Sequence, residues 1–173
     1  MKLALPALLM LASAPTAVAQ EWYTGVGYTY YSPDDVSFNT VTTRIGYNPT
    51  QINDYVGFEL EGLFGIGDDS IGAGAEQSLD FSIGGFAVGR YPLTERIEVF
   101  GRVGYQFVEI TTELFDAGAV TLESNDSEDG VAFGGGLNII LRGPNTLRVG
   151  YTYADATEAH LAEISYVYRF GAN

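Results

Sequence analysis

The stretch Ala162-Glu163-Ile164-Ser165-Tyr166-Val167-Tyr168-Arg169-Phe170 decides the fold of this chain. Every second residue in it is apolar or aromatic, and the residues between them are polar apart from Val167. Successive side chains of a β-strand point to opposite faces, so this segment predicts a strand with one apolar face and one polar, charged face.

Seven earlier segments alternate in the same way, and all except residues 147–153 are long enough for a tilted bilayer crossing, which needs about 9 to 11 residues. Three of the connections are short and contain proline, as expected of periplasmic turns, and four lie at the other end. The eight segments cover residues 22–31, 39–47, 55–66, 79–91, 97–110, 131–141, 147–153 and 162–170. The short connections are residues 48–54, 92–96 and 142–146, and the others are residues 32–37, 67–78, 111–130 and 154–158.

The first residues have the layout of a secretory signal peptide. Lys2 precedes an apolar stretch over residues 3–11, and residues 17–19 (Ala-Val-Ala) form a cleavage site for signal peptidase. The apolar stretch is too short to cross a bilayer as a helix, and no later stretch approaches the roughly 20 residues required. We therefore expect a signal peptide at residues 1–19 and one β-barrel domain at residues 20–173.

The composition is acidic and rich in glycine and aromatic residues. The chain has 8 Lys and Arg against 22 Asp and Glu, and loss of the leader with Lys2, its only charged residue, leaves a formal charge of 7 − 22 = −15. Such a chain should repel nucleic acid, so no nucleic-acid partner is expected. The 22 Gly, 12 Tyr and 10 Phe favour β-structure, and the absence of Cys excludes disulfides and a lipoprotein anchor.

Alternation alone would also fit a soluble barrel or sandwich, in which the apolar face points inward. Two features favour a membrane barrel instead. The polar face is rich in glycine, as the crowded interior of a small barrel requires. Aromatic residues gather at both ends of the apolar face, like the girdles at two membrane interfaces. The girdle residues are Trp22, Tyr47, Tyr91 and Phe170 at one end and Tyr30, Phe64, Phe81, Phe107 and Tyr153 at the other.

Four motifs carry a family resemblance: residues 22–27 (WYTGVG), 86–92 (FAVGRYP), 99–105 (VFGRVGY) and 166–170 (YVYRF). With them the chain resembles the small outer-membrane β-barrel proteins, which include the transmembrane domain of outer-membrane protein A and short porin-like relatives. The resemblance implies an all-β fold, an eight-stranded antiparallel up-and-down transmembrane β-barrel. It also implies a monomer in the outer membrane of a Gram-negative cell, in contact with lipid and lipopolysaccharide. The barrel-assembly machinery would then recognise a C-terminal signal formed by Tyr166, Tyr168 and Phe170.

Five arginines and five acids fall on the predicted inward face, with all the arginines in its periplasmic half. The interior of an eight-stranded barrel is just wide enough for side chains, and unpaired charges there would be costly. We therefore expect an ion-paired belt that fills the barrel. A narrow gated pore for ions or small solutes is the alternative. The belt residues are Arg44, Glu59, Glu61, Asp80, Arg90, Glu98, Arg102, Arg148, Glu163 and Arg169.

His160 is the only histidine, at the outer start of the last strand. Small barrels that modify lipids use a serine and a histidine near the outer rim. Barrel deacylases carry a serine two residues after the histidine, where this chain has Ala162, and Ser165 should face inward. We therefore expect no enzyme and no catalytic, cofactor or metal site; a lipid-modifying enzyme is the disfavoured alternative.

The connections at the outer end are acidic and contain no Lys or Arg. Residues 123–130 (ESNDSEDG) lack the spacing of a calcium-binding loop. The connections would form a solvated, mobile surface, bridge divalent cations to lipopolysaccharide, or bind a basic partner. The prediction is a non-enzymatic barrel with a structural or surface-interaction role through these loops. The acids are Asp34, Asp35, Asp68, Asp69, Glu76, Glu113, Asp116, Glu123, Asp126, Glu128, Asp129, Asp155 and Glu158.

Overall fold

The computed structural model describes residues 21–33, 37–49, 55–66, 69–72, 75–116 and 119–170. The predicted signal peptide lies outside these residues. They contain nine strands, and no helix among them is long and apolar enough to cross a membrane. The strands are β1 (Glu21–Pro33), β2 (Phe38–Asn48), β3 (Val56–Gly65), β4 (Asp69–Gly72), β5 (Ala75–Pro92), β6 (Ile97–Asp116), β7 (Ala119–Arg142), β8 (Asn145–Ala154) and β9 (Ala159–Arg169).

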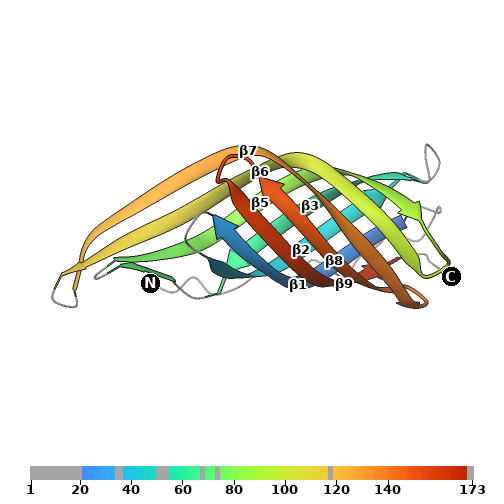
Figure 1. Ribbon diagram of the computed structural model, residues 1–173, viewed down its shortest axis with the longest axis horizontal. Coiled ribbons are helices and arrows are strands. Elements are labelled where there is room, and N and C mark those ends of the chain that lie inside the picture. Colours follow the sequence, from blue (N-terminus) through green and yellow to red (C-terminus); the bar gives the residue numbers. More distant parts are fainter. Residues whose placement is uncertain are drawn as a thin grey trace.

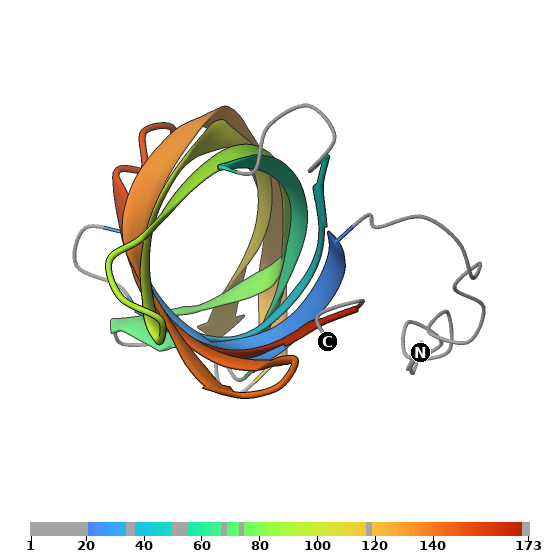
Figure 2. The same ribbon diagram turned by 90° about the vertical axis from the view of Figure 1, so that its right-hand side faces the viewer.

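Eight of the strands close into an antiparallel barrel, as the sequence predicts. Their order around the ring is β3-β2-β1-β9-β8-β7-β6-β5, and β5 returns to pair with β3. Closure therefore joins the first strand to the last, and Val26 lies opposite Tyr166. The one strand outside this ring, β4, pairs only with β5 in the described part of the chain. Figure 2, viewed from the end with the short turns, shows the strands as a ring.

A ribbon of long strands projects from the opposite end of the barrel. β6 and β7 stay paired past the last β7–β8 pair (Ala132 with Ala154), from Val108 opposite Glu128 to Asp116 opposite Ala119, and β5 pairs with β6 up to Ala75 opposite Leu114. Figure 1 shows β6 and β7 reaching past the other strands on the left. The prediction of loops at residues 67–78 and 111–130 was therefore wrong for most of both segments. These segments lack an apolar alternation, and they form strands because the hydrogen-bond ladder of the barrel continues into them.

The apolar face of the strands points outward. Phe58, Leu60 and Val103 are 56%, 51% and 54% exposed, whereas Arg148 and Glu59 on the opposite face are 1% and 4% exposed. A soluble barrel would have the reverse arrangement, with apolar side chains inside and charges in solvent. The outer face therefore fits contact with lipid.

This outer face forms an apolar band with polar edges. On β6, the outward residues from Ile97 to Phe107 include no charged side chain, and at about 3.4 Å per residue and about 45° of tilt this segment spans roughly 24 Å. Polar side chains appear at the edges, where the Tyr105 hydroxyl donates to Asp129. The same pattern holds for Tyr28 with Asn39, Tyr151 with His160 and Tyr166 with Asn145.

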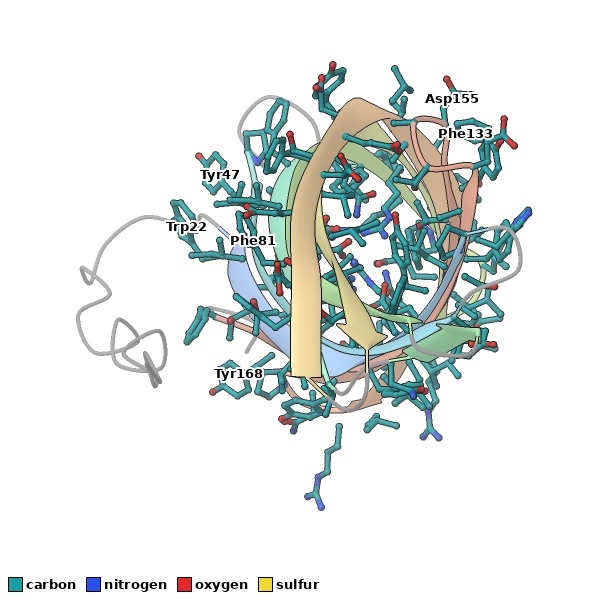
Figure 3. The ribbon with its side chains drawn as sticks, turned by 90° about the vertical axis from the view of Figure 1, so that its left-hand side faces the viewer. Trp22, Tyr47, Phe81, Phe133, Asp155 and Tyr168 are labelled. Carbon is teal, nitrogen blue, oxygen red and sulfur yellow. The ribbon has the colours of Figure 1, made fainter. Side chains whose placement is uncertain are left out.

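Aromatic pairs line both edges of the band. At the short-turn end, the rings of Trp22 and Tyr47 lie 4.9 Å apart, and those of Tyr55 and Tyr91 are stacked at 6.0 Å. At the long-strand end, the close pairs are Phe81 with Phe107 at 6.1 Å and Phe133 with Tyr153 at 5.6 Å. Figure 3 shows Trp22 and Tyr47 outside the ring of strands. These pairs have the placement of the two interfacial girdles of a membrane barrel.

Candidate functional site

The candidate site is the interior of the barrel, and Glu59 lies at its centre. Its Oε1 accepts hydrogen bonds from the Tyr23 hydroxyl at 2.6 Å and from Arg148 Nη1 at 2.8 Å. Arg90 lies 3.5 Å from the same oxygen and Arg102 lies 4.0 Å from Oε2. One carboxylate on β3 therefore interacts with side chains from four other strands.

A second group of ion pairs adjoins the first. Glu61 accepts hydrogen bonds from Arg44 and Arg102, each at 2.6 Å, and Arg44 also lies 2.6 Å from Glu163. The Ser165 hydroxyl donates to Glu163. Because Arg102 is in contact with both Glu59 and Glu61, the two groups form one network.

The short-turn end of the interior holds the remaining pair. Arg169 lies 2.8 Å from Glu98, and the Asn138 amide donates to Glu98 at 2.8 Å. The Asn138 carbonyl oxygen accepts from Arg148 Nε at 2.9 Å and so connects this pair to the network. Nine of the ten predicted belt residues thus lie in one connected network, with five arginines and four glutamates. All eight barrel strands contribute to it, β1 through Tyr23 and β7 through Asn138.

Asp80 is the exception, and its prediction as a belt residue was wrong. The ladder between β5 and β6 shifts register at Leu79 and Phe81, where two residues of β5 occupy the space of one. This β-bulge reverses the faces on its far side, so Asp80 is exposed while Leu79 is buried. The Thr111 hydroxyl donates to the Asp80 carboxylate. A bulge depends on the partner strand, so alternation within β5 could not reveal it.

Aromatic rings support three of the arginines, a role that was not predicted from the sequence. The guanidinium carbons of Arg90, Arg102 and Arg148 lie 4.4 Å from the ring centroids of Tyr23, Phe86 and Phe100 respectively. The sequence could have indicated it, because Phe86 and Arg90 lie an even number of residues apart on one strand, as do Phe100 and Arg102, and such pairs share the inward face.

Inward glycines make room for these rings. A Cβ at Gly136 would lie 2.9 Å from Phe100 Cε1, and one at Gly104 would lie 2.7 Å from Phe86 Cδ1. The glycines therefore permit the two aromatic rings to lie flat against the barrel wall.

An apolar cap lies at the long-strand end of the interior. Tyr31, Phe38, Leu63, Leu161 and Val108 are buried there in one hydrophobic cluster, each at most 2% exposed. The sequence-based expectation was a polar interior throughout, so this layer was missed. In Figure 3, viewed from this end, side chains fill the ring of strands. The same cluster includes Phe86 and Phe100, so apolar packing continues from the cap to the aromatic rings beside the charged network.

His160 lies on the outer face of β9. Its Nδ1 is hydrogen-bonded to the Tyr151 hydroxyl, and its ring lies 5.9 Å from Tyr151 and 5.4 Å from Tyr153. Ser165 is buried inside the barrel against Glu163. The histidine and this serine thus lie on opposite faces of the strand, which is not the geometry of a nucleophile and its base.

The projecting ribbon is acidic where its side chains are described. Asp126, Ser127, Glu128 and Asp129 on β7 are all exposed. Within the described part of the chain, no three His, Asp or Glu side chains are placed to hold a metal ion. The described side chains of the ribbon therefore form an acidic, exposed surface.

Comparison with known proteins agrees with this architecture. The family model described as the outer membrane protein beta-barrel domain matches residues 4–170. No curated protein matches the chain.

Three solved structures illustrate the likeness. A major outer membrane protein of Thermus thermophilus has a TM-score of 0.67 and 12% identity, over 88% of this chain and 100% of that one. OprG of Pseudomonas aeruginosa has a TM-score of 0.60 and 13% identity, over 87% and 95%. Ail, the attachment invasion locus protein of Yersinia pestis, has a TM-score of 0.56 and 14% identity, over 87% and 97%. At these identities the likeness concerns the fold.

Proposed function

The chain belongs to the outer membrane protein beta-barrel domain family, and from that premise we propose that it is a closed, non-enzymatic surface barrel whose projecting ribbon binds a cationic protein or peptide. Short turns mark the periplasmic end of such barrels and long connections the extracellular end. The ribbon of β6 and β7 then stands outside the cell, where a partner can reach it.

The charge of the ribbon is the observation that carries this proposal. From residue 109 to residue 129 the sequence has seven acids and no Lys or Arg. The backbones of β6 and β7 are paired along this segment past the last β7–β8 pair. A field of one sign attracts a partner of the opposite sign and accelerates its association. The acids are Glu109, Glu113, Asp116, Glu123, Asp126, Glu128 and Asp129.

The filled interior supports a non-conducting barrel. A solute would have to break the Arg–Glu network and then cross the apolar cap formed by Tyr31, Phe38, Leu63, Leu161 and Val108. An apolar constriction resists wetting and so opposes ion passage. A pore would need both the network and the cap to rearrange.

The chemistry of the ribbon separates this chain from one of its structural neighbours. Ail has a structure in complex with the heparin analogue sucrose octasulfate, a polyanion. The described extracellular strand ends of this chain carry acids such as Asp126 and Glu128 and no Lys or Arg. A polyanion would be repelled there, so the expected partner is of opposite charge.

Binding of a fluorescent oligo-arginine peptide to the refolded protein in nanodiscs tests the proposal. We expect binding that weakens as salt rises and that falls at least tenfold in the variant Asp126→Asn/Glu128→Gln. The matched control is Glu95→Gln, an exposed acid in the turn at the periplasmic end. Equal binding by all three proteins would contradict a role for the ribbon.

Planar bilayer recording tests the closed interior separately. Stable insertion without current supports the proposal, whereas discrete current steps from the unmodified protein would favour the pore. Heat-modifiable gel mobility verifies that the inserted protein is folded.

The membrane partners are part of the proposal. We expect a monomer in outer-membrane lipid and lipopolysaccharide, assembled by the barrel-assembly machinery through Tyr166, Tyr168 and Phe170. Because the described extracellular rim has no cation, contact with lipopolysaccharide phosphates would require divalent cations. Removal of divalent cations by a chelator should therefore weaken co-purification of lipopolysaccharide with the barrel.

A further inference from the structure

An open groove interrupts the outer face of the barrel at its periplasmic end. It has a volume of about 460 Å³ and runs along the end of β3 and across β5 and β6. The outer side chains around it are aromatic or aliphatic, and the stacked rings of Tyr55 and Tyr91 stand at one side. Its lining consists of Tyr55, Val56, Gly89, Arg90, Tyr91, Val99, Phe100 and Gly101.

The floor of the groove is backbone. Gly89 on β5 lies opposite Gly101 on β6, so both strands lack an outward side chain at this level of the groove. A Cβ at Gly89 would have no neighbour closer than 4.0 Å, and one at Gly101 none closer than 3.9 Å. Interior packing therefore does not require these two glycines, unlike Gly136 and Gly104.

The positive charge outside the barrel interior gathers at the same end. Seven arginines are described, and five of them lie in the interior network. The other two, Arg96 and Arg142, are exposed, and neither forms an ion pair with another described residue. Arg96 lies in the turn that joins β5 to β6, the two strands of the groove, and Arg142 ends the neighbouring β7. The Ile140 N–H donates to the Arg96 carbonyl oxygen at 2.8 Å, so the two turns adjoin.

We propose that this groove holds one acyl chain of an anionic phospholipid of the periplasmic leaflet, with the phosphate placed at Arg96 and Arg142. An apolar groove at this depth takes up a hydrocarbon chain, and exposed cations at its mouth select a negative head group. Glu95 is the one acid in the β5–β6 turn. It balances only one of the two arginines, so the β5–β6 and β7–β8 turns together keep a net positive charge.

The size of the groove favours a lipid over a second copy of the chain. Eight residues line it, whereas a stable protein interface involves about 20 to 30 residues on each side. The two outward glycines of the lining, Gly89 and Gly101, are one strand spacing apart, roughly 5 Å, which is the scale of a lipid chain rather than of a barrel wall.

Native mass spectrometry of the refolded protein in micelles with equal amounts of phosphatidylglycerol and phosphatidylcholine tests this site. We expect the unmodified protein to retain one phospholipid, with phosphatidylglycerol preferred. Gly101→Leu fills the groove and should reduce retention at least tenfold. Arg96→Gln/Arg142→Gln should abolish the preference for phosphatidylglycerol.

The matched control is Gly85→Leu. Gly85 also faces outward on β5, a Cβ there meets nothing within 4 Å, and it does not line the groove. Unchanged retention in this control supports the site. If Gly101→Leu fails to fold, Gly89→Ala introduces a smaller obstruction and should reduce retention partially.

Three results would overturn the inference. These are no retained lipid in the unmodified protein, equal retention by Gly101→Leu, or equal loss in Gly85→Leu, which would indicate nonspecific lipid. A dimer that disappears in Gly101→Leu would also overturn it, in favour of a second copy as occupant. None of these results depends on the cationic partner of the ribbon.

Discussion

Glu59 on β3 and Arg148 on β8 form an ion pair of 2.8 Å across the lumen of the barrel. The two strands are four places apart in either direction around the eight-stranded ring, so they lie on opposite walls. Counting side-chain atoms alone, Glu59 is 0% exposed and Arg148 is 1% exposed. The pair therefore acts as a brace between walls that no backbone hydrogen bond connects.

Glu59→Gln should destabilise the barrel by about 3 to 5 kcal/mol, because removal of one partner leaves buried arginine charge without compensation. Urea unfolding in lipid vesicles, followed by heat-modifiable gel mobility, measures the change. Glu95→Gln, at an exposed turn position, is the control and should change the free energy by less than about 0.5 kcal/mol. A similarly small change in the free energy of unfolding for Glu59→Gln would contradict the central role of Glu59 in the network.

Phe100→Leu should cost about 2 kcal/mol through its contact with Arg148, because a cation over an aromatic face is strongly attracted when both are shielded from water. A double-mutant cycle with Arg148→Met isolates this coupling from the loss of packing. Phe58→Leu, on the lipid-facing side, gives the control. Additive effects of Phe100→Leu and Arg148→Met would show that the ring serves only to fill space.

Leu60→Arg should cost roughly 2 to 4 kcal/mol, because Leu60 faces lipid near the middle of the band. Ile66 lies at the extracellular end of the same face, so Ile66→Arg should lower the free energy of unfolding by no more than about 1 kcal/mol. Unfolding of the two variants in the same vesicles makes the comparison. Equal costs would mean that the apolar band is not placed across the bilayer as described.

Replacement of residues 112–124 by Asn-Gly should shorten the ribbon without loss of the barrel. Thr111 and Asn125 face each other, so a two-residue turn can join them. The deleted pairs contribute nothing to ring closure, so we expect unchanged heat-modifiable mobility and weaker binding of oligo-arginine. Loss of the gel band of the folded protein would show that the ribbon is needed for the stability of the barrel.

Phe170→Ala should lower the amount of folded protein in the outer membrane of cells while refolding in vitro changes little. The Phe170 and Tyr168 rings meet edge to face with centroids 5.1 Å apart. The Phe170 N–H donates to the Trp22 carbonyl oxygen at 2.7 Å, and this backbone hydrogen bond survives the substitution. Comparison of membrane fractions with refolded protein separates assembly from stability. An equal defect in both would argue against a signal for the assembly machinery.

The faces of the strands could be predicted from the sequence, because they depend on parity within a strand. Arg44, Glu61 and Arg102 lie inside as their positions in the alternation require, and Leu60 and Val103 lie outside. The alternation predicted the wrong face for Asp80, because the bulge is a feature of the pairing between β5 and β6 and not of either strand alone. The apolar cap was not predicted because Phe38 and Leu161 lie just outside the predicted strands 39–47 and 162–170, so the alternation assigned them no face.

The sequence by itself determined that this chain forms an eight-stranded barrel with an apolar outer face, because a period of two assigns every side chain to one of two sides. Only the tertiary structure decided which inward residues meet. The contact of Glu59 with Arg148 depends on ring closure and on the stagger of all eight strands, which no single segment encodes. The ribbon likewise depends on a hydrogen-bond ladder that begins in the barrel, and the groove depends on the register that aligns Gly89 with Gly101.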